Sequence, residues 1–185
     1  MKLHIFKIAI FFLALGVFAS CDSNPVVDFG EQYKKTIYIV NSRGMLYSQE
    51  HFYDNEEGVI EISVYCGSSE PIKKDINVTL KINPEALDSL NKLNSLGDPL
   101  YVNKTILPES HYDFSKGTVT IKAKTQYTPL QIPIITKGLD ADITYTLPIS
   151  IVSNDANYDI NPELKTIIYE LRMVNGYSGS FSGSS

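Results

Sequence analysis

The sequence predicts an all-β fold, an immunoglobulin-like antiparallel two-sheet β-sandwich of about seven strands with one short crossover helix. Three observations lead to this prediction. Seven short segments alternate apolar and polar residues, as strands with one buried face do. Turn-forming stretches rich in Gly, Pro, Asn and Asp separate these segments. Helical periodicity appears in a single stretch, directly after Asn83.

The strongest alternation runs from Thr144 to Val174, in two strands joined by a polar turn. One face of each strand carries large apolar residues, and the other face carries mostly polar ones. Two strands alone cannot cover such faces, so we expect a second layer of sheet against them. The apolar residues are Tyr145, Leu147, Ile149 and Ile151 in the first strand and Ile167, Tyr169, Leu171 and Met173 in the second.

The same two-residue period predicts five further strands, at 35–41, 59–66, 75–82, 117–124 and 129–136. Pro133 has no N–H to donate to a neighbouring strand, so we expect its strand to lie at a sheet edge or at a bulge. Residues 42–58 are polar and aromatic and end in turn-forming residues, so this stretch is predicted to be a loop.

The stretch after Asn83 predicts the one helix. Asn83 can cap the first turn, and Pro84 suits the first helical position because no amide hydrogen bond is lost there. Leucines follow at three-residue intervals from Leu87, and Gly97 fits the end of the helix. We expect this helix to cross between strands over an end of the sheets.

Residues 1–20 resemble a bacterial lipoprotein signal peptide, with two lysines before an apolar stretch that is too short to span a bilayer. Cys21 follows small residues and is the predicted lipidation site and first residue of the mature chain. A standard secretory peptide with an incidental cysteine is the alternative. The predicted organisation is then a tether at 21–31, a sandwich domain at 32–174 and a Gly/Ser-rich tail at 175–185, in which a second module could begin.

The mature chain is acidic. The full sequence has 16 basic and 21 acidic residues, and losing the two lysines of the signal leaves 14 against 21, a net charge of about −7. This balance argues against a nucleic acid partner and against electrostatic attraction to an anionic membrane. The second cysteine, Cys66, is in phase with the apolar residues of its strand and is predicted to be buried and unreactive.

Several phrases of the sequence together resemble one protein family. The motifs are 107–112 (LPESHY), 145–153 (YTLPISIVS) and 158–163 (YDINPE), supported by the helix at 86–94 and the strand at 117–121. With the leader, they resemble the Bacteroidetes surface-lipoprotein N-terminal domain family known as domain of unknown function 1735. The resemblance implies an immunoglobulin-like accessory domain and supplies no catalytic residues to carry over.

The resemblance further implies a lipid-anchored, non-catalytic domain on the outer membrane that faces the cell exterior. Its implied role is an accessory or spacer module of a glycan-capture lipoprotein. The implied partners are the membrane, through the lipid on Cys21, and polysaccharide or outer-membrane glycan-uptake proteins. A direct glycan-binding protein and an adhesin or pilus-like subunit assembled by strand addition are the alternatives. We expect no enzyme activity, no cofactor and no nucleic acid partner.

Tyr47, Phe52 and Tyr53 are the candidate glycan-binding residues, because flat aromatic rings stack on sugar faces and these rings fall in the predicted loop. Rings that cap the sandwich core are the alternative. The acidic turn at 54–57 lacks the ordered spacing of a calcium loop, and the histidines lack that of a zinc site, so we expect no metal. Residues 138–144 echo the acidic motif of family 18 glycosidases, but a threonine replaces the required acid, so we expect no catalysis there.

Overall fold

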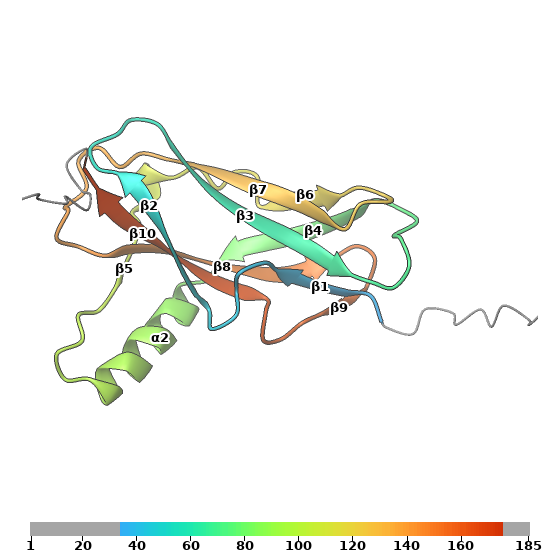
Figure 1. Cartoon of the computed structure of the whole chain (residues 1–185), viewed down its shortest axis with the longest axis horizontal. Coiled ribbons are helices and arrows are strands. Elements are labelled where there is room, and N and C mark those ends of the chain that lie inside the picture. Colours follow the sequence, from blue (N-terminus) through green and yellow to red (C-terminus); the bar gives the residue numbers. More distant parts are fainter. Residues whose placement is uncertain (1–33, 176–185) are drawn as a thin grey trace, which may run out of the picture. The chain divides into compact units, whose positions relative to one another are not determined.

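The computed structural model describes residues 34–175, which form ten strands, one α-helix and one turn of 3-10 helix (Figure 1). In chain order the elements are β1 (Thr36–Ile39), β2 (Leu46–Phe52), β3 (Gly58–Gly67), β4 (Ile76–Ile82), α2 (Pro84–Gly97), β5 (Thr105–Ile106), η2 (Glu109–His111), β6 (Thr118–Ile121), β7 (Tyr127–Ile134), β8 (Tyr145–Asn154), β9 (Asp159–Ile160) and β10 (Thr166–Val174). The predicted signal, Cys21 and the tether lie outside the described residues, as does the tail from residue 176 onward.

Two sheets pack face to face and form the predicted sandwich. One has the strand order β7-β3-β1-β9, and the other has the order β2-β10-β8-β4-β6, with β5 beside the start of β8. The seven predicted strands pair with one another only in antiparallel fashion. Three strands that were not predicted, β2, β5 and β9, each pair in parallel with a predicted strand. Strand β7 is an edge strand of its sheet, as Pro133 predicts.

The core between the sheets follows the predicted alternation. In β3, Ile60, Ile62, Val64 and Cys66 are at most 3% exposed, which confirms the predicted burial of the thiol. Strands β8 and β10 face them with a second set of buried side chains. Each large apolar side chain contributes roughly 1.5–3 kcal/mol when it is fully buried. The second set consists of Tyr145, Leu147, Ile149, Ile151, Ile167, Tyr169 and Leu171.

Helix α2 forms a third layer on the outer face of the sheet that contains β8 and β10 (Figure 1). Leu87 and Leu90 are buried there against Ile168, which is fully covered. The predicted place of the helix, over an end of the sheets, is therefore wrong, because Ile168 is an apolar residue on the outer face of this sheet and needs a cover. The predicted helix limits are confirmed. Asn83 precedes the helix, but its side-chain amide donates to the hydroxyl of Ser150 (2.9 Å) instead of capping the first turn.

The predicted loop at 42–58 is wrong for its central part, because Leu46–Phe52 forms the edge strand β2. This strand pairs in parallel with β10 along its full length. Its composition is polar because only Tyr47 and His51 are partly buried, while the other side chains of this edge strand face solvent. Such a strand lacks the apolar alternation that marks a half-buried strand in sequence.

The described chain enters and leaves the sandwich at opposite ends (Figure 1). Strand β1 begins at Thr36, which is paired with Gly67 at the last position of β3. Strand β10 ends at Val174, whose carbonyl accepts a hydrogen bond from the N–H of Tyr53 (2.7 Å), shortly before β3 begins at Gly58. The ten residues of β3 therefore separate the entry end from the exit end, by roughly 33 Å at 3.3 Å per residue. In the described part of the chain, no helix is long and apolar enough to cross a bilayer.

Candidate functional site

Three connecting segments meet at the exit end: the β2–β3 turn, the β5–β6 segment and the β7–β8 segment. Hydrogen bonds join them. The N–H of Thr136 donates to the carbonyl of Asn55, and the N–H of Ile135 donates to the carbonyl of His111, both at 2.9 Å. The hydroxyl of Thr136, whose residue is 2% exposed, donates to the carbonyl of Phe52 (2.7 Å). Because a buried side chain anchors these segments, the exit end has a defined surface.

A groove of about 730 Å³ opens between these segments. We call it the exit groove. Its apolar lining comes from the adjacent starts and ends of β3 and β7, and its polar groups come from the connecting segments. A mainly apolar pocket with a few convergent polar groups is the usual form of a ligand site. The lining residues are Glu56, Glu57, Gly58, Val59, Ser110, Tyr112, Asp113, Pro133, Ile134 and Ile135.

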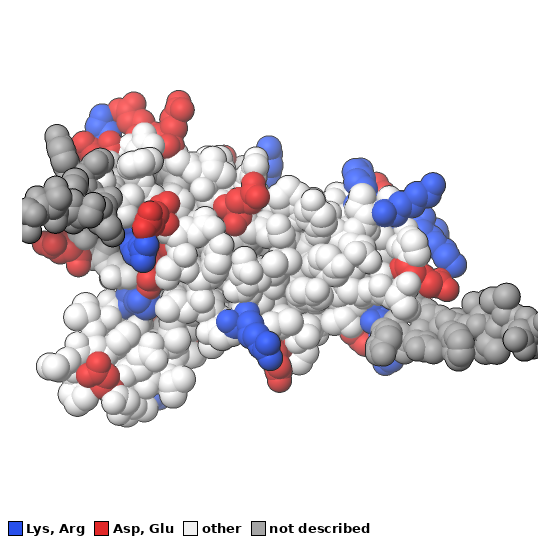
Figure 2. Space-filling view, in the orientation of Figure 1, with Lys and Arg blue, Asp and Glu red and all other residues white. Residues whose placement is uncertain are grey.

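The surface beside the exit groove is acidic. Figure 2 shows acidic side chains gathered over the β2–β3 turn, where Asp54, Glu56 and Glu57 are all exposed. Lys137 offsets part of this charge through an ion pair with Glu56 (2.5 Å). Hydrogen bonds from the side chain and the backbone of Ser115 lower the pKa of Asp113, so its carboxylate is ionised at neutral pH. The groove therefore disfavours anionic ligands and suits neutral or cationic ones.

The structure separates the three predicted glycan-binding residues. Tyr47 lies on the inward face of β2, with its ring edge-on to Tyr169 and the ring centroids 5.8 Å apart. Phe52 is five residues further along the same strand, so its side chain points to the opposite face, and it is 64% exposed. Tyr53 follows in the turn and is 42% exposed. Phe52 and Tyr53 are thus available at the exit end, whereas Tyr47 belongs to another surface.

A hydrogen-bonded cluster that the sequence did not predict links β2 to β10. The hydroxyl of Tyr169 donates to Oε1 of Gln49 and lies 2.9 Å from Nε2 of His51. The side-chain amide of Gln49 donates to the hydroxyl of Tyr47 (2.6 Å). Burial, with a smaller effect of Tyr47, raises the pKa of Tyr169, and burial lowers the pKa of His51. The lowered pKa of His51 and the raised pKa of Tyr169 favour the neutral forms of both side chains, so the cluster joins the edge strand to β10 without a buried charge.

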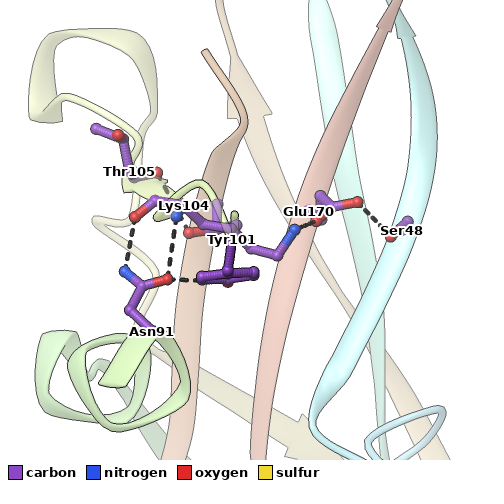
Figure 3. Close-up of polar contacts among 7 residues, drawn as sticks. Ser48, Asn91, Tyr101, Lys104, Thr105 and Glu170 are labelled. Atoms are coloured by element: carbon purple, nitrogen blue, oxygen red, sulfur yellow. Dashed lines mark hydrogen bonds and ion pairs between the residues drawn. The ribbon is translucent and has the colours of Figure 1, made fainter. Parts of the chain in front are cut away.

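A second polar network fixes helix α2 and the segment that follows it (Figure 3). Asn91 of the helix holds the backbone of Lys104: its amide donates to the Lys104 carbonyl (2.8 Å), and its oxygen accepts the Lys104 N–H (3.0 Å). The hydroxyl of Tyr101 also donates to this oxygen (3.1 Å). The ammonium of Lys104 pairs with Glu170 of β10, which also accepts a hydrogen bond from the hydroxyl of Ser48 (2.7 Å).

Two opposing effects set the protonation of Glu170. Burial disfavours its carboxylate form, but hydrogen bonds from Lys104 and Ser48, with the charges of Lys104 and Arg172, outweigh burial and lower its pKa. Glu170 is therefore a permanently ionised partner of Lys104 near neutral pH, not a proton donor. The network joins a helix to a sheet, and its role is structural.

The glycosidase-like segment and the possible metal ligands of the sequence do not form a site in the described residues. Gly138 has a φ of 81°, and the N–H of Asp142 donates to the carboxylate of Asp140 (2.9 Å), so the segment that echoes a glycosidase motif forms the predicted turn, with both aspartates exposed. Among residues 34–175, no group of three or more His, Cys, Asp and Glu side chains could hold a metal ion.

Comparison with known proteins adds a family and a fold. The model of a family that is described as a "-like, N-terminal domain" matches residues 33–157. A solved multidomain protein from Bacteroides ovatus that includes domain of unknown function 1735 has a TM-score of 0.63 and 22% identity, over 80% of this chain and 47% of that chain. A putative carbohydrate binding protein from Bacteroides ovatus has a TM-score of 0.58 and 14% identity, over 74% and 36%.

An endoglycosidase of Bacteroides thetaiotaomicron, EndoBT-3987 with its Man5GlcNAc product, has a TM-score of 0.54 and 21% identity, over 71% of this chain and 31% of that chain. At these identities the likeness shows the fold alone. The chain spans less than half of each of these three proteins. A search of curated proteins finds no significant match.

Proposed function

We propose a function from one premise: the chain belongs to the N-terminal domain family known as domain of unknown function 1735. It serves as a lipid-anchored, non-catalytic accessory or spacer module on the outer-membrane surface, in a lipoprotein that captures glycans. Cys21 carries the lipid, and the membrane is its first partner.

The observation that carries this proposal is the separation of the entry end from the exit end. The chain enters at Thr36 and leaves at Val174, and the ten-residue strand β3 runs from one end to the other. A lipid anchor upstream of Thr36 and a module downstream of Val174 would therefore be held on opposite sides of a packed domain. A rigid spacer needs this arrangement, because its two attachments must stay at a constant distance.

The pKa shifts of three described carboxyl groups support a structural role for these groups. Glycoside hydrolysis needs one carboxylic acid that stays protonated near neutral pH, and enzymes obtain it by raising a pKa. Asp75, Asp113 and Glu170 have lowered pKa values instead, because the hydrogen bonds that they accept favour the ionised form. These groups are suited to holding loops and elements in place.

The glycan part of the proposal draws on the structural neighbours. One is a putative carbohydrate binding protein, and another holds a Man5GlcNAc product. Both are much longer than the part that this chain matches. We therefore assign glycan capture to a module that follows the exit end in the natural assembly, and spacing to the domain described here.

The lipid anchor is tested by changing Cys21→Ala and following the protein in membrane and soluble fractions. The change should move it from the membrane fraction to the soluble fraction, because a lipid needs the thiol. Ser23→Ala is the matched control and should stay with the membrane. Membrane retention of the Cys21→Ala protein would contradict lipidation.

Direct glycan binding is the second candidate, because Phe52 and Tyr53 are exposed at the exit end. Isothermal titration of the soluble Cys21→Ala protein with a panel of polysaccharides separates the two functions. A spacer should give no binding heat. Binding that is lost in a Phe52→Ala, Tyr53→Ala protein, but kept in Tyr127→Ala, would establish the second candidate. Tyr127 is a suitable control because it is 60% exposed and lies at the entry end.

A further inference from the structure

The exit groove has an exposed apolar surface that the spacer role does not use. Val59 is 51% exposed and Ile135 is 44% exposed, and both line the groove beside Pro133 and Tyr112. Apolar surface gathered in a concave site marks a place where another apolar group binds. The question is which group lies close enough to cover it.

The end of β10 lies next to this groove. The carbonyl of Val174 accepts a hydrogen bond from the N–H of Tyr53 (2.7 Å). Val174 is also paired with Phe52 in the β10–β2 strand pair. The carbonyl of Phe52 accepts the hydroxyl of Thr136 (2.7 Å), and Ile135 is the preceding residue in the chain. Hydrogen bonds therefore connect the end of β10 to the β2–β3 turn, and this turn to Thr136, which is adjacent in sequence to the groove residue Ile135.

The chain that follows Val174 has the right length and composition. Residues 176–185 contain two large side chains, Tyr177 and Phe181, and otherwise only Gly and Ser. At about 3.3–3.6 Å per residue, the chain can reach roughly 10 Å from Val174 at Tyr177 and roughly 24 Å at Phe181. The segment has no charged side chain that the acidic rim would repel, and its serine hydroxyls can donate to carboxylates.

We propose that residues 176–185 bind back into the exit groove, where the aromatic rings of Tyr177 and Phe181 cover Val59 and Ile135. Covalent attachment beside the groove favours this occupant over a second copy of the chain or a free ligand, because a short flexible link gives an effective concentration in the millimolar range. Gly and Ser between the rings allow the backbone to approach the groove closely. The proposal does not depend on the lipid anchor or on the spacer role.

Methyl NMR of the soluble Cys21→Ala protein tests the proposal. Removing residues 176–185 should shift the methyl signals of Val59 and Ile135 and leave those of Leu87, a residue of α2 that is buried against the sheet, unchanged. The shortened chain keeps every described strand, so it should remain folded. A synthetic peptide with the sequence of residues 176–185, added to the shortened chain, should return the methyl signals of Val59 and Ile135 towards their positions in the full-length protein.

Two variants of the full-length protein complete the test. Tyr177→Ser with Phe181→Ser should reproduce the shifts of the shortened chain, whereas Ser178→Ala with Ser184→Ala should not. A spin label on Ser185→Cys should broaden the signals of Ile135 more than those of Leu87, and Cys66 will not compete for the label because it is fully buried.

Three results would overturn the proposal. Identical Val59 and Ile135 signals with and without the segment would mean that the segment does not touch the groove. Signals that change only with protein concentration would assign the groove to a second copy. Signals that respond to polysaccharide but not to loss of the segment would assign it to a sugar.

Discussion

The ammonium of Lys104 and the carboxylate of Glu170 form an ion pair, and each side chain is only 15% exposed. Lys104 belongs to the segment after α2. Glu170 lies on the outer face of β10, two residues after Ile168, which is covered by the helix. The pair and the apolar contact therefore fasten the third layer to the sheet at neighbouring points of one strand.

Removing either member of the ion pair should destabilise the domain. Lys104→Met or Glu170→Gln should each lower the free energy of unfolding by about 2 kcal/mol, because the partner is left charged, poorly solvated and without its counter-ion. The double variant should lose less than the sum of the two. Urea unfolding followed by circular dichroism measures these changes.

The matched control for the ion pair is Lys122→Met. It removes a pair with Asp75 in which the two side chains are 69% and 48% exposed. Exposed pairs contribute little because water and salt screen them, so the loss should be much smaller than that in Lys104→Met. An equal loss in Lys104→Met and Lys122→Met would contradict the assigned role of the Lys104–Glu170 pair.

Glu170 should also make stability depend on pH. Its pKa is lowered in the folded protein relative to the ordinary value of 4.5. A lowered pKa means that the stabilisation is complete above pH 4.5 and is lost as the pH falls through the folded pKa. Urea midpoints measured from pH 7 to pH 3 should therefore fall less steeply in Glu170→Gln than in the natural protein. Because Asp75 and Asp113 also have lowered pKa values, only the difference between the two curves reports on Glu170.

Two leucines of one helix should respond differently to truncation. Leu87 is 4% exposed in the contact with the sheet, whereas Leu96 is 78% exposed. Leu87→Ala should cost about 2–3 kcal/mol, because it removes buried apolar surface and leaves a cavity. Leu96→Ala should change stability by less than about 0.5 kcal/mol, as surface substitutions usually do. Thermal unfolding of both variants checks this, and similar losses would contradict the placement of α2 on the sheet.

The buried hydroxyl of Tyr169 should matter for the edge strand β2. Tyr169→Phe removes a group that bonds to Gln49 and His51, and should cost about 1–2 kcal/mol because the partly buried ring of His51 loses a hydrogen-bond partner. Tyr65→Phe is the control, since its hydroxyl bonds to Gln126 at the surface, and it should change stability by less than about 0.5 kcal/mol. Faster hydrogen exchange in β2 of Tyr169→Phe than of Tyr65→Phe would locate the effect.

The unpredicted parts of the fold share one physical cause. Strand β2 is polar because it lies at an edge, and its partner β10 is more than a hundred residues away in the chain. Its only local signal is the spacing of Tyr47, Gln49 and His51 at alternate positions. The exit groove is likewise built from the segments around Val59, Tyr112 and Ile135, none of which is adjacent to another in sequence. Local patterns could not bring them together.

The sequence by itself determined the seven antiparallel strands, the limits of the helix and the burial of Cys66. These follow from periodicity and from Pro and Gly positions, which act over a few residues. Only the tertiary structure decided the three parallel strands, the face that α2 covers and the opposite placement of Thr36 and Val174. These depend on which apolar surface each element covers, and that choice is made by packing between residues that are far apart in the chain.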